Sequence, residues 1–271
     1  MKNTTKKLFN KVASLALAAM MVLSVFCVST PTEVSAADKS FKSTGKSSVT
    51  ITDEQCYSAT GQPTWIKFTA KNDGYLKITA KMASTYYADF VQGYWTLYNK
   101  TKKAAVSPQK LYSTNYTDSY YYTNVYGVKK GTTYYLQVLS DGGVKIDAAF
   151  TKVTDKSGTK KAKALSVKKG KAVTGLIRVG DKNSDWYKIT LTKKQKLSIN
   201  ITPYANDTIS VNIVGPGISG SDTITSNYYG EKCPYTIVDK HHKPTKASTG
   251  TYYVQIKPTK KSTSGYYKIS W

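Results

Sequence analysis

The chain has 271 residues and carries 40 Lys and Arg against 16 Asp and Glu, a formal net charge of +24. Hydrophobic residues make up 40% of it and aromatic residues 12%, which is too much for a disordered polypeptide. Three cysteines exclude a disulfide-rich scaffold, and two histidines leave little material for metal or acid–base chemistry.

The first 36 residues have the pattern of a secretory signal peptide. Four lysines precede the uncharged apolar run 12–28, and the small residues Ser35, Ala36 and Ala37 follow it. The alternative is an uncleaved membrane anchor, because the run is nearly long enough to span a bilayer. We expect cleavage after Ala36 and an extracellular product that is released, or held at the cell surface without a covalent anchor.

The mature chain keeps 36 basic and 15 acidic residues, a net charge of +21. It has no further apolar run of about 18 residues, so we expect no integral membrane segment after the signal peptide. Its two cysteines, Cys56 and Cys233, fall in different halves of the chain. A disulfide bridge between them is one alternative, and two free thiols are the preferred interpretation.

The mature sequence repeats itself, which predicts two similar domains. Domain boundaries are expected at 37–154 and 165–271, with a linker rich in Lys, Ser and Gly at 155–164. Four blocks recur in the same order: Trp65-Ile66-Lys67-Phe68-Thr69 and Trp186-Tyr187-Lys188-Ile189-Thr190; Leu76 and Ile78 against Leu197 and Ile199; Tyr134-Tyr135-Leu136-Gln137-Val138 and Tyr252-Tyr253-Val254-Gln255-Ile256; Val144-Lys145-Ile146 and Tyr267-Lys268-Ile269.

Apolar residues alternate with period two inside these blocks, which indicates half-buried strands. No segment of useful length after the signal peptide has a helical period. We therefore predict an all-β protein of two tandem antiparallel β-sandwich, jelly-roll-like domains, each of about eight short strands. The expected inward residues are Ile66, Phe68, Ala70, Leu76, Ile78, Ala80, Tyr134, Leu136, Val138, Val144, Ile146 and Ala148 in the first copy, and Tyr187, Ile189, Leu191, Leu197, Ile199, Ile201, Tyr252, Val254, Ile256, Tyr267, Ile269 and Trp271 in the second.

The second copy resembles a known family. It contains the runs Gly180-Asp181, Asp185-Trp186-Tyr187-Lys188-Ile189, Gly250-Thr251-Tyr252-Tyr253-Val254 and Gly265-Tyr266-Tyr267-Lys268-Ile269. These are similar to the bacterial pre-peptidase C-terminal domain, a jelly-roll-like β-sandwich appended to secreted hydrolases. The resemblance is good over 158–271 and loose over 39–153. In the first copy, Thr60-Gly61-Gln62-Pro63-Thr64 stands before the Trp strand in place of the Gly-Asp run of the second copy. The resemblance implies a non-catalytic accessory module, although no catalytic domain accompanies it here.

The same resemblance draws attention to calcium, because some related collagen-binding domains bind it. Asp181, Asn183 and Asp185 place oxygen ligands at alternate positions just before a predicted strand. The alternative is a polar turn in which the Asp side chains accept backbone N–H groups. Lys182 adds positive charge within the loop, and the first copy has no equivalent, so the turn is preferred.

Aromatic residues crowd the middle of the first copy and suggest a glycan-binding platform, because sugar rings stack on such side chains. The alternative is that Tyr suits strands and that many of these rings cover the core. Gln92, Asn115, Asp118 and Asn124 could fix the orientation of a sugar. The candidate ligand-binding rings are Tyr86, Tyr87, Tyr94, Trp95, Tyr116 and Tyr121, within a group that also includes Tyr98, Tyr112, Tyr120, Tyr122 and Tyr126.

Lysine clusters favour polyanionic partners such as an anionic cell-wall polymer. Specific nucleic-acid recognition is disfavoured because base reading relies on Arg, and Arg178 is the one Arg of the sequence. The alternative is that Lys only keeps strand edges soluble. The clusters lie at Lys129-Lys130, Lys160-Lys161, Lys163, Lys168-Lys169, Lys171, Lys193-Lys194, Lys196 and Lys260-Lys261.

Catalysis is not expected. Nucleophilic catalysis needs a nearby base, and the two histidines are the adjacent His241 and His242 in a Lys-rich loop. The sequence therefore predicts a secreted, non-catalytic module that attaches to a carbohydrate or an anionic cell-wall polymer, with no cofactor apart from the calcium alternative. The competing interpretations are a structural spacer without a ligand of its own and, less favoured, an accessory protein of a hydrolase.

Overall fold

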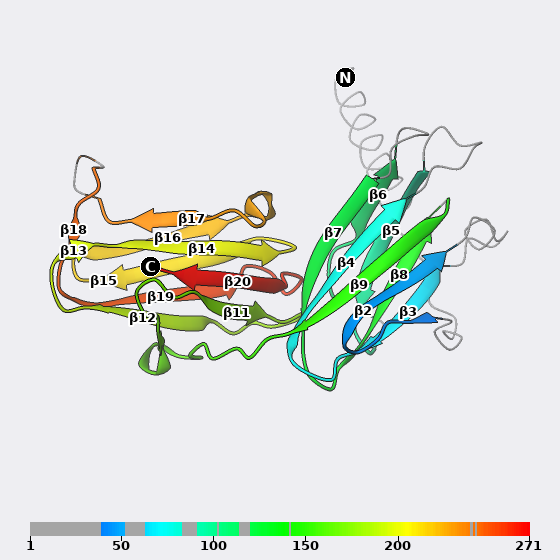
Figure 1. Cartoon of the computed structure of the whole chain (residues 1–271), viewed down its shortest axis with the longest axis horizontal. Coiled ribbons are helices and arrows are strands. Elements are labelled where there is room, and N and C mark those ends of the chain that lie inside the picture. Colours follow the sequence, from blue (N-terminus) through cyan, green and yellow to red (C-terminus); the bar gives the residue numbers. More distant parts are fainter. Residues whose placement is uncertain are drawn as a thin grey trace, which may run out of the picture. The chain divides into compact units, whose positions relative to one another are not determined.

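Strands dominate the computed structural model of the chain (Figure 1), which describes residues 39–51, 63–82, 91–101, 103–113, 120–140, 142–238, 241 and 243–271. Within these ranges there is no α-helix, only the short 3-10 helices η1 (Lys161–Lys163) and η2 (Ser226–Tyr228). The predicted all-β class is therefore confirmed. The predicted signal peptide at 1–36 lies outside the described residues, and within them no helix is long and apolar enough to cross a membrane.

The strands β1 to β9, which we call the first half, form two sheets. The five-stranded sheet has the order β1-β3-β8-β5-β6, and the four-stranded sheet has the order β2-β9-β4-β7. All pairs are antiparallel except β1 with β3. The bounds are β1 (Lys39–Ser40), β2 (Gly45–Ile51), β3 (Thr64–Thr69), β4 (Gly74–Met82), β5 (Val91–Tyr98), β6 (Gln109–Ser113), β7 (Tyr120–Val128), β8 (Thr133–Ser140) and β9 (Val144–Lys152).

The strands β10 to β20, the second half, form a five-stranded sheet β10-β12-β19-β15-β16, a four-stranded sheet β11-β20-β14-β17 and the small pair β13-β18. Only β10 and β12 pair in parallel. The bounds are β10 (Leu165–Ser166), β11 (Val173–Ile177), β12 (Asp185–Leu191), β13 (Gln195–Lys196), β14 (Ser198–Ala205), β15 (Ile209–Gly215), β16 (Ile218–Ile224), β17 (Cys233–Thr236), β18 (Lys246–Ala247), β19 (Gly250–Pro258) and β20 (Gly265–Ser270).

The two halves share one strand order, and the four repeated sequence blocks occupy equivalent places in it. They lie on β3 and β12, β4 and β14, β8 and β19, and β9 and β20, with Leu197 directly before the first residue of β14. Even the parallel pair repeats, because Lys39 lies opposite Ile66 in the first half and Leu165 lies opposite Tyr187 in the second. The repeat of sequence is therefore a repeat of architecture.

Inward residues from both sheets of each half meet in one hydrophobic cluster, so each half is a β-sandwich. All the residues predicted to face inward are buried, apart from Trp271. Trp271 packs against the second core but stays partly exposed, and its indole N–H donates to the Val167 carbonyl oxygen at 2.7 Å. Asp38–Trp271 form one compact unit that contains both cores, and the predicted boundaries at 37–154 and 165–271 stay a prediction.

The segment predicted as a linker, 155–164, is bonded to the second half. The Gly158 N–H donates to the Trp186 carbonyl oxygen at 3.2 Å, and the Trp186 N–H donates to the Gly158 carbonyl oxygen at 2.7 Å. The short helix η1 follows at once. These bonds form an isolated bridge that attaches the segment to β12 in the five-stranded sheet of the second half.

Candidate functional site

Aromatic side chains gather on the outer face of the five-stranded sheet of the first half. In register, Trp65 on β3 lies opposite Gln137 on β8, and Tyr98 on β5 lies opposite Tyr135 on β8. The Trp65 and Tyr98 rings meet edge to face with centroids 5.0 Å apart. Tyr98 Oη donates to Gln137 Oε1 at 3.0 Å. All four side chains are partly exposed, and we call Trp65, Tyr98, Tyr135 and Gln137 the first aromatic face.

The first aromatic face continues along β5 and β8. Tyr94 lies opposite Leu139 in register, and the side chains are 46% and 39% exposed. Residues separated by an even number of positions share one face of a strand, so Tyr94 lies on the same side as Tyr98, and Leu139 on the same side as Gln137. The apolar area open to solvent therefore extends beyond the four residues that define the face.

The second half carries an equivalent surface, the second aromatic face, formed by Trp186, Tyr253 and Gln255. Trp186 on β12 lies opposite Gln255 on β19, as Trp65 does opposite Gln137. Lys161 Nζ lies 4.7 Å from the centroid of the Tyr253 ring, a cation–π distance. Gln255 Nε2 donates to Ser184 Oγ at 2.8 Å. The three side chains are partly exposed.

In the blocks on β3 and β12 and on β8 and β19, the outward residues are identical in the two halves, whereas the inward ones differ apart from Tyr134 and Tyr252. The other two blocks keep inward residues instead, because Leu76 and Leu197, Ile78 and Ile199, and Ile146 and Ile269 are identical pairs. The outward pairs are Trp65 and Trp186, Lys67 and Lys188, Thr69 and Thr190, Thr133 and Thr251, Tyr135 and Tyr253, and Gln137 and Gln255.

Threonine contacts explain only part of this identity. Thr69 Oγ1 lies 3.0 Å from Thr133 Oγ1, and Thr190 Oγ1 lies 3.3 Å from Thr251 Oγ1, so these residues form cross-strand hydrogen bonds. No equivalent core role accounts for the outward Trp, Lys, Tyr and Gln. Their repetition points to a constraint on the surface itself.

The predicted ligand-binding rings differ in their exposure to solvent. Tyr94 is exposed, as predicted. Trp95 is fully buried in the first core, and its indole N–H donates to Tyr126 Oη at 3.0 Å. The interpretation of Trp95 as a contact ring is therefore wrong, because it lies on the inward side of β5 with Leu97. Of the other four, Tyr86, Tyr87 and Tyr116 lie outside the described residues, and Tyr121 lies in β7 with its side chain outside the description.

Sequence reasoning missed Trp65, Tyr135, Trp186 and Tyr253 as site residues. The signal was available, because these residues occupy the outward positions of the repeated blocks. The crowding of Tyr between 86 and 126 drew attention away from them, since composition does not show on which side of a strand a ring lies.

Two of the three predicted calcium ligands, Asp181 and Asp185, are engaged by other groups of the protein. Asp181 Oδ1 accepts the Asn183 N–H at 3.0 Å, and Asp181 Oδ2 lies 3.8 Å from Arg178 Nη1. Asp185 turns to Ser157 and Tyr267 instead. Among the described residues, no three His, Cys, Asp or Glu side chains are grouped as a metal site. The bond from the Asn183 N–H to Asp181 Oδ1 is that of the polar turn, which was the preferred interpretation, and calcium binding stays a prediction.

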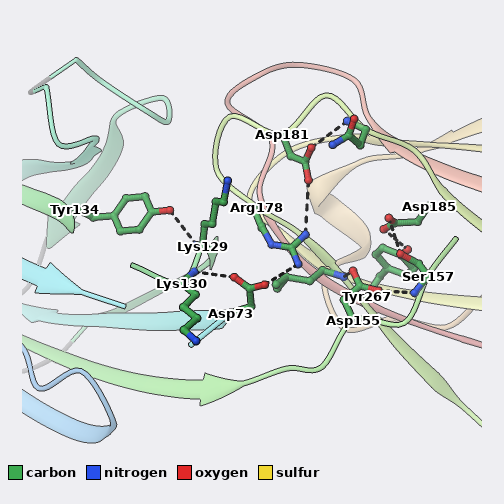
Figure 2. A network of polar contacts seen from close by, with 12 residues as sticks. Asp73, Lys129, Lys130, Tyr134, Asp155, Ser157, Arg178, Asp181, Asp185 and Tyr267 are labelled. Carbon is green, nitrogen blue, oxygen red and sulfur yellow. Dashed lines mark hydrogen bonds and ion pairs between the residues drawn. The ribbon is translucent and has the colours of Figure 1, made fainter. Parts of the chain in front are cut away.

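Asp185 belongs to a network of polar contacts in the second half (Figure 2). Its Oδ1 accepts from Ser157 Oγ at 2.8 Å, and its Oδ2 accepts from Tyr267 Oη at 2.6 Å. Tyr267 Oη also lies 2.8 Å from Tyr187 Oη. Burial and, next, the nearby Asp155 carboxylate raise the pKa of Asp185 to about 7.

The same network anchors the predicted linker. Asp155 Oδ1 accepts the Ser157 N–H at 2.8 Å, and Asp155 Oδ2 accepts the Leu176 N–H at 2.9 Å. Gly175 makes room for the hydroxyls, because a Cβ there would lie 2.2 Å from Tyr267 Oη. These carboxylates are thus engaged in bonds that hold chain segments together.

Comparison with known proteins leaves the family open. No family model matches the sequence, and no curated protein matches it. Similar solved structures include tripeptidyl peptidase 2, with 9% identity and a TM-score of 0.26 over 77% of this chain and 21% of that one. This chain therefore spans about a fifth of the length of that peptidase.

Two further matches are at the same level. The N-terminal tandem of CBM22 domains from Paenibacillus barcinonensis is 8% identical, with a TM-score of 0.26 over 76% of this chain and 81% of that one. A secreted-protein candidate from Eubacterium rectale is 9% identical, with a TM-score of 0.27 over 82% and 72%. Matches with scores this low do not assign the chain to a family or a function.

Proposed function

We propose that the mature chain is a secreted, non-catalytic module that attaches to a carbohydrate polymer through its two aromatic faces. The observation that carries this proposal is the identity of the outward Trp, Lys, Tyr and Gln in the blocks on β3 and β12 and on β8 and β19, where the inward residues differ apart from Tyr134 and Tyr252. A surface under no constraint has no reason to keep these four residue types twice.

The chemistry of the faces suits a sugar chain. The rings of Trp and Tyr offer flat apolar surfaces for the C–H faces of sugars, and they carry polar atoms at their edges. The Gln137 and Gln255 amides can bond hydroxyl groups beside those rings. Both faces lie on open sheets, whereas small molecules are bound mainly in concave pockets. An extended polymer fits better, and two faces on one chain add avidity.

The resemblance of the second copy to the pre-peptidase C-terminal domain supports a non-catalytic role, because members of that family are accessory modules. The carboxylates and hydroxyls of the Asp185 network are already engaged in structural hydrogen bonds. The role proposed for the chain is therefore attachment, and its place outside the cell follows from the pattern of residues 1–36.

A retention assay tests the proposal. The mature chain is passed over immobilised polysaccharides and cell-wall fractions, alongside Trp65→Ala, Trp186→Ala and the control Tyr228→Ala. Tyr228 is 49% exposed but belongs to neither face. We expect each face variant to weaken retention and the control to leave it unchanged. Equal retention of all the variants, or no retention of the wild type, would overturn the proposal.

A spacer without a ligand is the second candidate function, and the contacts between the halves favour it. Arg178 Nη2 binds Asp73 Oδ2 at 3.1 Å (Figure 2). The Val179 N–H donates to the Gly127 carbonyl oxygen at 2.8 Å. Such hydrogen bonds are expected where two modules must keep a fixed orientation to each other. The retention assay separates the two functions, since a spacer has no need of its aromatic faces.

A further inference from the structure

A hollow of about 560 Å³ lies where the end of β9 meets β11 and β20. Its lining is rich in hydroxyl and ammonium groups and includes no Asp or Glu. The residues that line it are Tyr75, Thr151, Lys152, Val153, Thr154, Lys156, Leu165, Ser166, Val173, Thr174, Tyr266 and Lys268.

One wall of the hollow is aromatic. Tyr75 and Tyr266 stack with ring centroids 4.1 Å apart and an angle of 17° between the ring planes. Tyr204 stacks on the other side of Tyr266, with centroids 4.4 Å apart and an angle of 9°. The rings are partly exposed. Stacking fixes them, so they offer a rigid surface that costs little conformational entropy on binding.

Three lysines surround that wall. Lys268 stands two residues after Tyr266 on β20, and it lies opposite Thr174 of β11 in register. Lys152 is next to Thr151, which lies opposite Tyr75. Lys156 follows in the segment that leads to the second half. All three side chains are exposed, so their ammonium groups are accessible to a ligand.

Among the described residues, none of these three lysines forms an ion pair. The ion pairs found among the described residues join Asp73, Asp147, Asp181 and Asp207 to cations other than Lys152, Lys156 and Lys268. Three like charges at one hollow repel one another, and the repulsion is relieved when an anion binds. Lysine gives point charges without the fork geometry of Arg, which suits repeated anionic groups on a flexible chain.

We propose that this hollow binds a polyanionic glycan, a sugar or polyol chain that carries a phosphate or carboxylate on its repeat units. The lysines hold the anionic groups, the Tyr75 ring and the exposed edge of the Tyr266 ring contact the sugar or polyol, and Thr151, Thr174 and Ser166 bond hydroxyls. The site shares no residue with either aromatic face, so it stands or fails independently of the proposed function.

A charge-matched pair of variants tests the proposal. The triple variant K152Q/K156Q/K268Q removes the cations of the hollow. The control K193Q/K194Q/K196Q removes the same charge from the turn between β12 and β13 and from β13 itself. Binding of polygalacturonate and of poly(glycerol phosphate) is titrated at low salt and at about 0.5 M salt, where surface attraction is largely screened. Thermal unfolding checks that both variants fold.

We expect the hollow variant to lose about tenfold in affinity and the control to change by less than about threefold, since only directed contacts depend on position. Preference for one polymer identifies the anionic group as phosphate or carboxylate. Equal losses in the two variants would show a diffuse attraction and overturn the proposal. An unchanged hollow variant, or a wild type that binds neither polymer, would overturn it as well.

Discussion

Asp73 and Arg178 connect the two halves of the chain. Asp73 Oδ2 accepts from Arg178 Nη2 at 3.1 Å, and Asp73 Oδ1 accepts the Lys130 N–H at 2.7 Å (Figure 2). Arg178 Nη1 also lies 3.8 Å from Asp181 Oδ2. A planar guanidinium can face two carboxylates at once, which an ammonium does less well. The sole Arg of this Lys-rich sequence therefore stands where that geometry is required.

A double-mutant cycle measures this contact. We expect Asp73→Ala and Arg178→Ala to show a coupling free energy of about 1 kcal/mol, because the side chains are only 38% and 25% exposed. The control pair, Lys145 and Asp147, is 3.8 Å apart and half exposed, so its coupling should be close to zero. Urea unfolding provides both values. Equal coupling in the two cycles would contradict a structural role for the Arg178 contact.

Gly127 allows the backbones of the halves to approach each other. A Cβ at this position would lie 2.0 Å from the Ile177 carbonyl oxygen and 2.8 Å from the Gly265 carbonyl oxygen, and neither can move without moving its strand. We expect Gly127→Ala to lower the free energy of unfolding by about 1–3 kcal/mol. Gly220→Ala is the control, because its Cβ would meet nothing within 4 Å. Two variants of equal stability would show that the close approach does not matter.

The Asp185 network predicts a stability that falls as pH rises. The pKa of Asp185 is about 7 in the folded chain, raised by burial and then by Asp155, against 3.8 for an ordinary Asp. Between about pH 4 and pH 7 the folded state thus binds more protons than the unfolded state, and protonation favours folding. The loss across this window is on the order of a few kcal/mol.

Asp185→Asn isolates this contribution. The variant is uncharged at every pH, so we expect its melting temperature to be nearly flat from pH 4 to pH 7 while that of the wild type declines. Asp73 and Asp207 do not interfere, because their pKa values lie below that of an ordinary Asp. Burial raises both pKa values, but a backbone N–H group and a cation, Arg178 at Asp73 and Lys260 at Asp207, lower them by more. Their contribution is lost only below that window. Parallel curves for the two proteins would be incompatible with a raised Asp185 pKa.

The two tryptophans of the first half should separate stability from binding. Trp95 is fully buried and bonded to Tyr126, so Trp95→Ala is expected to cost about 3–5 kcal/mol of unfolding free energy. Trp65 is partly exposed on the first aromatic face, so Trp65→Ala should cost much less. Chemical unfolding of the two variants checks this order, and the reverse order would contradict the placement of the rings.

Period-two alternation predicted the strands and cores because each repeated block has apolar residues on one side only. It did not place Trp95, since β5 has large side chains on both sides, with Tyr94 and Tyr98 outward and Trp95 and Leu97 inward. There the neighbouring strands decide which side is buried. Trp271 was expected inward on the same pattern, but it follows the last residue of β20 and is only partly covered.

The candidate site depended on long-range geometry in the same way. The alternating pattern of its block predicts that Trp65 faces outward. Its contact with Tyr98 has no such local signal, because it joins β3 and β5 across β8. The Asp73 contact with Arg178 spans 105 positions of the chain. Neither pairing has a local signal, because strand order rather than sequence spacing brings these residues together.

Retention of the double variant Trp65→Ala/Trp186→Ala tests the central claim most directly. Wild type, the two single variants, the double variant and Tyr228→Ala are compared on a polysaccharide panel under identical conditions. The account predicts that at least one polysaccharide retains the wild type and Tyr228→Ala. It should retain each single variant less, because one face alone lacks the avidity of two, and release the double variant, which has neither face intact. A double variant retained as well as the wild type, or a wild type retained by no polysaccharide, would contradict it.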